Sequence, residues 1–339
     1  MKKKTSTMEC SKKIDIEIKG KPYSLPNSWD ALSPDEFVYL SGLLQDYAAG
    51  LLSVSDVRLR FVVYVLDIDM SYVPARHKDT IAQNLYILMS KITFIFNIKY
   101  PDQLWNGLSA ELRKEALKTE PKYLPDTPEV RLLRRCDYKY VIDGCFAAQL
   151  LPTITIGKVS CVGYTINTLC DQLSTSLTAR QYVDATECLN GIEKNRSLLP
   201  LLAATLYQPA GYSSEWAHDN VSLFAELPVA VLEAVALCFQ AFVLFLFTKT
   251  HFSILWKKTN TKDLQRNKLS VGLKDGIYTL SEDGYGDIHT VGEMSLIEYL
   301  EILRKKKIDA VRTMHSAEMK ITDIAEKTGL DFDTIQKII

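Results

Sequence analysis

Hydrophobic positions recur with the period of an α-helix along most of the 339-residue chain. The clearest helix start is Ser33-Pro34-Asp35-Glu36, where an N-cap serine precedes a proline at the first helical position and a glutamate at N3. We expect a helix from Pro34 to about Ala49, with Trp29 packed over its entry. One face is apolar at Phe37, Leu40, Leu43, Leu44 and Tyr47.

The same periodicity predicts helices at about 54–65, 78–96, 109–118 and 178–192. Thr178 and Gln181 form a second predicted capping box, with Leu177 and Tyr182 as its hydrophobic staple. Alternating apolar residues predict one β-hairpin at 14–25 and another at 153–162. The predicted fold is mainly α, a multi-helix soluble protein with one or two small β-hairpins and a C-terminal hairpin like a helix-turn-helix.

Prolines at 121, 125 and 128 break the helical pattern. They make Lys122–Pro128 the best candidate for a linker between domains. The expected organisation is then a flexible basic tail (1–13), an N-terminal hairpin plus helical region (14–120), a proline-rich segment with a short strand pair (121–163), a helical core region (164–260), a glycine-rich loop (261–293) and a C-terminal helical hairpin (294–339).

The longest apolar run, Val229 to Phe247, is interrupted only by Glu233 and Gln240. Its length approaches the roughly 20 apolar residues that span a bilayer, so length alone does not separate a core helix from a membrane anchor. Two polar residues inside the run favour a core helix, because each is costly at bilayer depth. If one face of this helix is exposed, the candidate partner-binding residues are Phe239, Phe242, Val243 and Leu246.

The protein as a whole has no strong electrostatic field, because 40 basic and 41 acidic side chains leave a net charge of -1. Binding to nucleic acid or to an anionic membrane therefore requires a local patch. Seven cysteines without a C-x-x-C pair argue against zinc and against a complete disulfide framework, which favours a reducing cytoplasm. The lysine-rich start lacks the apolar segment of a signal peptide, and we expect a solvated tail there.

Motifs for catalysis or cofactor binding are missing from the sequence. The five histidines form no H-x-x-x-H or H-E-x-x-H arrangement, and the chain has no G-x-S-x-G, P-loop or G-x-G-x-x-G motif. The acidic and glycine-rich stretch Asp283–Asp287 lacks the further ligands of a calcium loop and is interpreted as a turn. We therefore predict no enzyme activity, no catalytic residues, no cofactor and no metal site.

The C-terminal stretch Ile321–Ile338 has the spacing of a helix-turn-helix. Ala325 is small where two helices cross, Gly329 permits the turn, and Ile335 anchors the second helix. The candidate DNA-contact residues are Thr334, Gln336 and Lys337. Asp331 and Asp333 repel phosphate, however, and eight basic and eight acidic residues balance from Met294 onward. A structural helical hairpin is favoured, with a DNA-binding regulator as an alternative.

Three segments together resemble proteins of phage and prophage tail modules in Bacteroidetes-type bacteria. The first is Tyr23–Phe37, with the pattern W-x-x-L-S-x-x-E-F. The second runs from Thr178 to Pro228 and contains a T-x-x-Q-Y helix, Leu201–Pro209 with the pattern L-x-A-x-L-Y-x-P, and Phe224–Pro228 with F-x-x-L-P. The third is the long apolar helix that follows. These patterns are similar to those of tail assembly chaperones and minor tail proteins.

The resemblance covers about half of the chain and implies a function. A protein of this kind is not an enzyme, binds tape-measure or tail-tube proteins during assembly, and oligomerises on them. It acts in the cytoplasm of the bacterial host and is associated with the virion transiently, if at all. The helix-turn-helix-like hairpin is not a feature of such chaperones, so the resemblance leaves residues 294–339 without a role. A membrane-anchored protein using residues 229–247 remains a second alternative.

Overall fold

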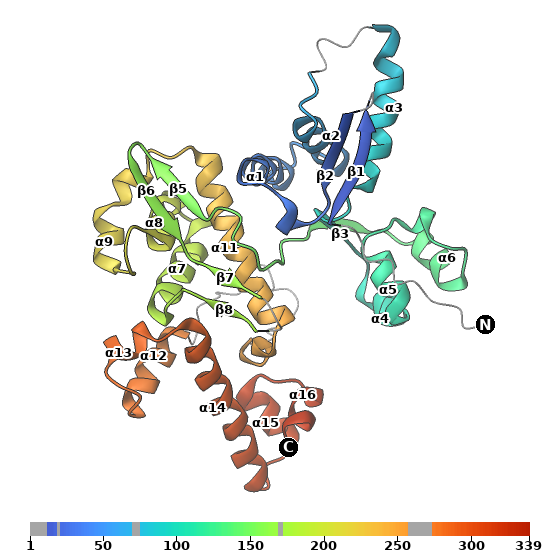
Figure 1. Ribbon diagram of the computed structural model, residues 1–339. Coiled ribbons are helices and arrows are strands. Elements are labelled where there is room, and N and C mark those ends of the chain that lie inside the picture. The colour runs from blue at the N-terminus through green and yellow to red at the C-terminus, as the bar shows by residue number, and fades with distance from the viewer. Residues whose placement is uncertain (1–11, 19–20, 70–74, 169–171, 257–272) are drawn as a thin grey trace, which may run out of the picture. The chain divides into compact units, whose positions relative to one another are not determined.

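The computed structural model describes residues 12–18, 21–69, 75–168, 172–256 and 273–339 (Figure 1). It is 60% helical, with 16 α-helices and only small two- or three-stranded sheets in these ranges. The mainly α prediction is therefore confirmed. The chain divides into two compact units, Met1–Gly144 and Cys145–Ile339, which are described separately.

The first unit begins with the predicted hairpin, β1 (Lys13–Ile18) paired antiparallel with β2 (Lys21–Pro26). Helices α1 (Pro34–Ala48) and α2 (Val54–Val65) follow, each opened by a serine capping box. At the first box, Ser33 Oγ accepts from the Glu36 amide at 3.3 Å, and Glu36 accepts from the Ser33 amide at 2.7 Å. The Trp29 ring meets Phe37 edge-on at 6.3 Å, as expected from the sequence.

Helix α3 (Ala75–Lys91) ends earlier than predicted, because the chain then enters strand β3 (Phe96–Lys99). This strand pairs antiparallel with β4 (Lys139–Ile142), which the sequence did not predict. Between the two strands lie α4 (Asp102–Asn106), α5 (Ala110–Ala116), the 3-10 turn η3 (Pro121–Tyr123) and α6 (Pro128–Arg135). Their shared core is formed by Ile98, Tyr100, Leu108, Ala116, Leu124, Val130 and Leu133.

The predicted linker Lys122–Pro128 is not a boundary between the units. Leu124 is buried in the core just described, and the Arg134 side chain donates to the carbonyl oxygens of Pro121 and Leu124. The prolines therefore shape a packed turn that leads into α6, with Pro128 at the first position of that helix. The division falls at Gly144, where no proline marks it.

The second unit is built around helices α7 (Ala179–Ile192), α8 (Leu199–Leu206) and α11 (Val229–Lys249), with the short helices α9 (Ser214–Asp219) and α10 (Val221–Phe224) between α8 and α11. Strands β5 (Thr153–Ile156) and β6 (Val159–Gly163) form the second predicted hairpin, which β9 (Tyr207–Gln208) extends. The two-residue strands β7 (Ile166–Asn167) and β8 (Ser174–Thr175) pair before α7.

The predicted capping box of α7 is only half formed. Thr178 Oγ1 accepts from the Gln181 amide at 3.2 Å, but the Gln181 side chain donates at 2.8 Å to the Thr205 carbonyl oxygen on α8. Gln181 therefore links two helices instead of closing its own cap.

Helix α11 is largely buried inside the second unit, where α8 and the 3-10 turn η6 (His251–Leu255) pack against it. It is the one helix in the described ranges that is long and apolar enough to cross a membrane, and 61% of its most apolar 18-residue stretch is buried. Of its two polar interruptions, Glu233 is 6% exposed and pairs with Arg196, which lies in the turn before α8. Local pairing and packing therefore accommodate the helix within the unit.

The segment predicted as a glycine-rich loop contains two helices. Residues 257–272 lie outside the described ranges, but α12 (Leu273–Glu282) and α13 (Ile288–Glu293) occupy most of the rest. Leu273, Ile277 and Leu280 are buried along one face of α12. Gly276 gives the Tyr299 hydroxyl room, since a Cβ there would lie 2.3 Å from it. Among the described glycines of this segment, Gly276 thus permits close helix packing, and Gly284 and Gly286 permit the intervening turn.

The chain ends in α14 (Leu296–Ser316), α15 (Ile321–Thr328) and α16 (Phe332–Ile338), the red helices in Figure 1. Val311, Ile324, Leu330 and Ile335 form their core. Gly329 ends α15 in the left-handed conformation at φ 68°, and Asp331 caps α16 by accepting from the Thr334 amide at 2.8 Å. The predicted terminal helical hairpin is present, and its first helix, α14, has 21 residues.

Candidate polar cleft

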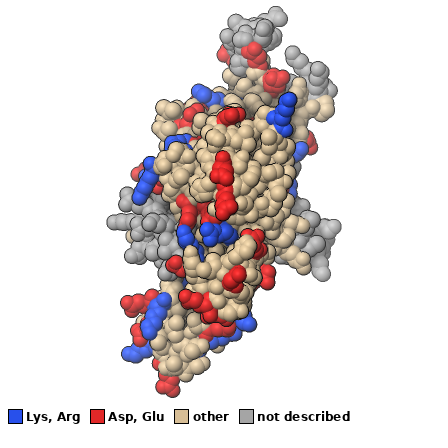
Figure 2. Space-filling view, turned by 90° about the vertical axis from the view of Figure 1, so that its left-hand side faces the viewer, with Lys and Arg blue, Asp and Glu red and all other residues tan. Residues whose placement is uncertain are grey.

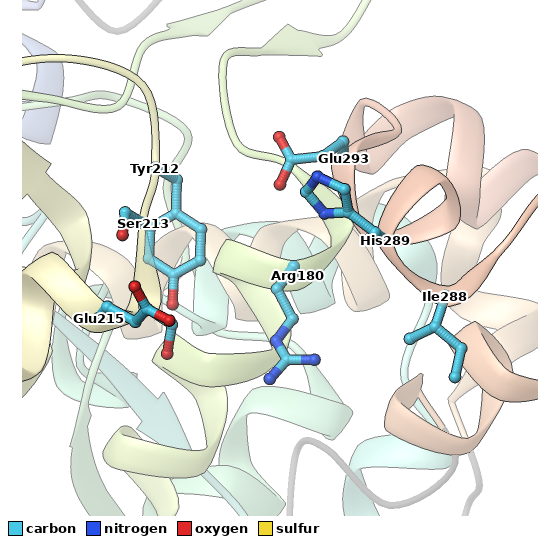
Figure 3. A pocket seen from close by; sticks show the side chains of 9 residues that line it. Arg180, Tyr212, Ser213, Glu215, Ile288, His289 and Glu293 are labelled. Carbon is cyan, nitrogen blue, oxygen red and sulfur yellow. The ribbon is translucent and has the colours of Figure 1, made fainter.

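A cleft of about 520 Å³ opens in the second unit between α7, the loop before α9, and α13. Its lining is mostly polar or charged and consists of Arg180, Tyr212, Ser213, Ser214, Glu215, Ile288, His289, Gly292 and Glu293. Figure 3 shows Arg180 between two walls, with Tyr212 and Glu215 on one side and His289 and Glu293 on the other. Three separate segments of the chain therefore contribute to one site.

The wall made by α13 is fixed against α7. The Ala179 amide donates to the Met294 carbonyl oxygen, and the Leu296 amide donates to the Leu177 carbonyl oxygen, each at 2.9 Å. Gly292 lies against the Arg180 side chain, so that an added Cβ would stand 3.3 Å from Arg180 Cβ. Backbone bonds and a close glycine contact therefore hold His289 and Glu293 at a defined distance from α7.

The opposite wall is held by the buried side chain of Gln208. Its Oε1 accepts from the Ser213 amide at 2.9 Å, and its Nε2 donates to the Ser213 carbonyl oxygen at 3.0 Å and to the Ala204 carbonyl oxygen at 3.2 Å. Ser213 in turn caps α9, accepting from the Trp216 amide. The turn containing Pro209 and Gly211 is thus fixed at both ends, and Tyr212 and Glu215 are placed by it.

Asp184 orients two of the side chains that line the cleft. Its Oδ2 accepts from Arg180 Nε at 3.1 Å and from the Tyr212 hydroxyl at 2.6 Å. Burial and this bond to Asp184 raise the pKa of the Tyr212 phenol well above its ordinary value, so the hydroxyl keeps its proton and remains a donor. The bonds to Asp184 hold both side chains in one orientation.

The arrangement presents both signs of charge to a ligand. The bond to Asp184 uses only the Nε of Arg180, and no described residue bonds to its Nη groups, which remain available as donors. His289 adds an imidazole, whereas Glu215 and Glu293 add carboxylates. A ligand with separated acidic and basic groups, such as a polypeptide segment, complements this set better than a simple anion or cation does.

The four residues proposed as a partner-binding face on α11 are not surface residues. Phe239, Phe242, Val243 and Leu246 are each 0% exposed. Phe239 packs against Tyr164 and Tyr182 at ring distances of 6.0 Å, and Phe242 also contacts Tyr164. The hypothesis required these four side chains to lie on an exposed face of α11. They are instead part of the core, because apolar side chains are buried on folding.

The three candidate DNA-contact residues lie on α16. Gln336 and Lys337 are exposed, and Thr334 is half-buried beside the Asp331 cap. Asp333 is also exposed on this helix. On the face shown in Figure 2, acidic and basic side chains are interspersed, and neither sign forms an extended patch.

Comparison of the chain with protein-family models, curated proteins and solved structures finds no match. No family assignment follows. The role of the cleft must therefore be argued from its own geometry and from the sequence resemblance described above.

Sequence reasoning missed every side chain that lines this cleft. Arg180 and Tyr212 lie inside or next to the quoted motifs, but no local spacing relates them to α13. The available signal was Asp287, followed three residues later by Thr290, because the Asp287 carboxylate caps α13 by accepting from the Thr290 amide at 2.7 Å. Recognising that cap would have replaced the predicted loop by a helix carrying His289 and Glu293.

Proposed function

We propose that this chain is a non-enzymatic assembly protein of a phage or prophage tail. It acts as a chaperone or minor tail protein and binds tape-measure or tail-tube proteins, in the bacterial cytoplasm and as an oligomer on its partner. In this proposal, the polar cleft takes a segment of the partner polypeptide. The protein associates with the virion only transiently, and α11 serves as the core of the second unit.

One observation carries the proposal: the three motifs of the resemblance that lie between Thr178 and Pro228 meet in one region of the second unit, whereas the Tyr23–Phe37 segment lies in the first unit. The T-x-x-Q-Y segment starts α7, and Gln181 of that motif bonds to Thr205 of the L-x-A-x-L-Y-x-P segment. Phe224 of the F-x-x-L-P segment is 0% exposed and belongs to α10, which packs on α8. Arg180 lies inside the first motif, and Tyr212 follows the second. Motifs that build one core and one cleft support a common structural role.

The test is co-expression of the full chain with the tape-measure or tail-tube protein encoded nearest to its gene. We expect co-elution as a defined complex and its loss when Arg180 is replaced by Glu, because that change reverses the charge between the two walls. Arg304→Glu is the matched control, since Arg304 also pairs with a carboxylate on its own helix but lies outside the cleft. Absence of a complex with either partner, or equal loss in both variants, counts against the proposal.

A DNA-binding regulator is the second candidate, supported by the geometry of the terminal hairpin. Gly329 turns the chain in the left-handed conformation between two short helices, and α16 exposes Gln336 and Lys337. These are features of a helix-turn-helix. Asp331 and Asp333 at the start of α16 weaken this candidate, because they face the phosphates that the N-terminus of a recognition helix approaches.

Duplex retention by the full chain separates the two candidates. A DNA reader should hold duplex in a salt-dependent way, and Lys337→Glu should weaken retention, while Lys305→Glu, on α14 and outside the α15–α16 pair, should not. Retention that is absent at low salt would eliminate the DNA-binding candidate and leave the assembly proposal untouched.

A further inference from the structure

The first unit contains a groove of about 610 Å³ between α5 and α6. Its apolar lining is Leu108, Leu112, Pro125 and Val130. Val130 is fully buried and Leu108 is 8% exposed, and both belong to the core that closes this part of the unit. Leu112 is half-buried and Pro125 is exposed, so the groove has an apolar floor that solvent reaches from one side.

Three carboxylates border this floor. Glu111 and Glu115 lie one turn apart on α5, and Glu129 lies in the first turn of α6 on the facing wall. All three side chains are exposed. The Glu129 pKa is lowered by hydrogen bonds with its own amide and the Thr127 hydroxyl, which keeps this carboxylate ionised.

The nearby arginines do not neutralise these carboxylates. Arg131 donates to Asp126 through Nε and Nη2, and Arg134 donates to Asp126 and to the Pro121 and Leu124 carbonyl oxygens. Within the described ranges, no ion pair involves Glu111, Glu115 or Glu129. The three carboxylates therefore form a negative rim without an ion pair in the described residues, and Arg131 and Arg134 of α6 are bonded to Asp126 instead.

We propose that this groove binds a basic amphipathic segment of a partner protein, with apolar side chains on Leu108, Leu112 and Pro125 and lysine or arginine side chains at Glu111, Glu115 and Glu129. An apolar floor gives affinity by removing hydrocarbon surface from water. Negative charge on both walls selects the sign of the partner and sets its orientation. This inference goes beyond the proposed function and does not rest on the polar cleft of the second unit.

The experiment measures binding of the full chain to a synthetic amphipathic helical peptide of leucine and lysine by isothermal titration calorimetry. We expect binding that weakens as salt is raised, and no binding of the counterpart in which glutamate replaces lysine. In the triple variant Glu111→Gln, Glu115→Gln, Glu129→Gln, the Kd should rise about tenfold or more, since three exposed charge pairs are lost.

The matched control changes three exposed carboxylates of the same unit outside the groove, Glu17→Gln, Asp35→Asn and Asp67→Asn. It alters the net charge equally, so equal weakening in both triple variants would show nonspecific attraction and overturn the proposal. Unchanged binding in the groove variant would overturn it as well. Light scattering tests whether the groove binds a second copy of the chain. Self-association that the groove variant abolishes would mean that it does, and would overturn the proposal. Circular dichroism of both variants verifies that they fold.

Discussion

Helices α11 and α16 obtain their stability in opposite ways. Helix α11 has no side-chain N-cap, but 12 of its 21 residues are buried. Helix α16 has 7 residues, of which only Ile335 is buried, and it starts with the Asp331 cap. A helix held mainly by burial leaves few side chains free, whereas one held by a cap and a single anchor presents most of its residues.

The difference in burial between α11 and α16 indicates where a partner can bind to the second unit. The most hydrophobic residues of the sequence, on α11, are committed to packing against Tyr164, Tyr182 and α8. Accessible polar residues lie on short elements such as α9, α13 and α16, together with a few exposed apolar side chains such as Ile288 and Phe332. Substitutions can test whether the two classes of helix really differ in this way.

The largest expected effect is that of Phe239→Ala in α11. Phe239 is 0% exposed and has an aromatic ring on either side, so the change leaves a cavity and should lower the free energy of unfolding by about 3–5 kcal/mol. Denaturant unfolding followed by circular dichroism measures it. Val229→Ala on the same helix is the control, because Val229 is 63% exposed and should change stability by about 0.5 kcal/mol or less. Similar losses for both would mean that α11 is not a closed core helix.

A smaller and local effect is expected for Ile335→Ala in α16. Ile335 belongs to the cluster with Val311, Ile324 and Leu330, and its truncation should cost this hairpin about 2–4 kcal/mol. Hydrogen exchange should rise in α15 and α16 while α11 stays protected. Phe332→Ala is the control, since Phe332 is 53% exposed. Faster exchange throughout α11 would show that the hairpin and the core unfold as one cooperative unit.

Much of this contrast could be predicted from the sequence, because it depends on local signals. The Ser33 capping box, the stripe from Phe37 to Leu44 and the Gly329 turn each lie within a few residues, and the structure has all three. The polar cleft could not be predicted, since Arg180, Tyr212 and His289 become neighbours only through the packing of α7, α8 and α13. Gln181 shows the same limit: its cap spacing is local, but its bond to Thr205 is not.

The glycines were misleading for a physical reason. A glycine-rich sequence lowers helix propensity, which suggested a loop over residues 261–293. In the structure, however, Gly276 and Gly292 each stand where a side chain would collide with Tyr299 or crowd Arg180. At both glycines, the close approach of a neighbouring helix outweighs the low helix propensity of glycine. This approach is a tertiary contact, so the local sequence does not indicate it.

A third, intermediate effect should follow from Arg196→Gln. Arg196 pairs with Glu233, whose side chain is 8% exposed, so the change leaves a nearly buried carboxylate without its cation. Because the Arg196 side chain is 63% exposed and water can partly replace it, we expect a loss of about 1–2 kcal/mol. Lys274→Gln breaks the exposed pair with Glu187 and should cost about 0.5 kcal/mol or less. Equal effects would mean that Glu233 is solvated, and that α11 is less enclosed than its packing indicates.

The smallest effect concerns the thiol inside α11. Burial raises the pKa of Cys238 to about 11, and its Sγ lies 3.3 Å from Gln149 Oε1. The pKa of this thiol is higher in the folded state than its ordinary value of 9.0. The neutral thiol therefore stabilises the fold fully at a pH below 9.0, and this contribution is lost as the pH rises towards 11. At pH 8 we expect iodoacetamide to label Cys238 far more slowly than the partly exposed Cys145, and the two rates to converge in urea. If Cys238 and Cys145 are labelled at the same rate without denaturant, α11 opens readily. Helices α11 and α16 would then differ only in how much of each is buried.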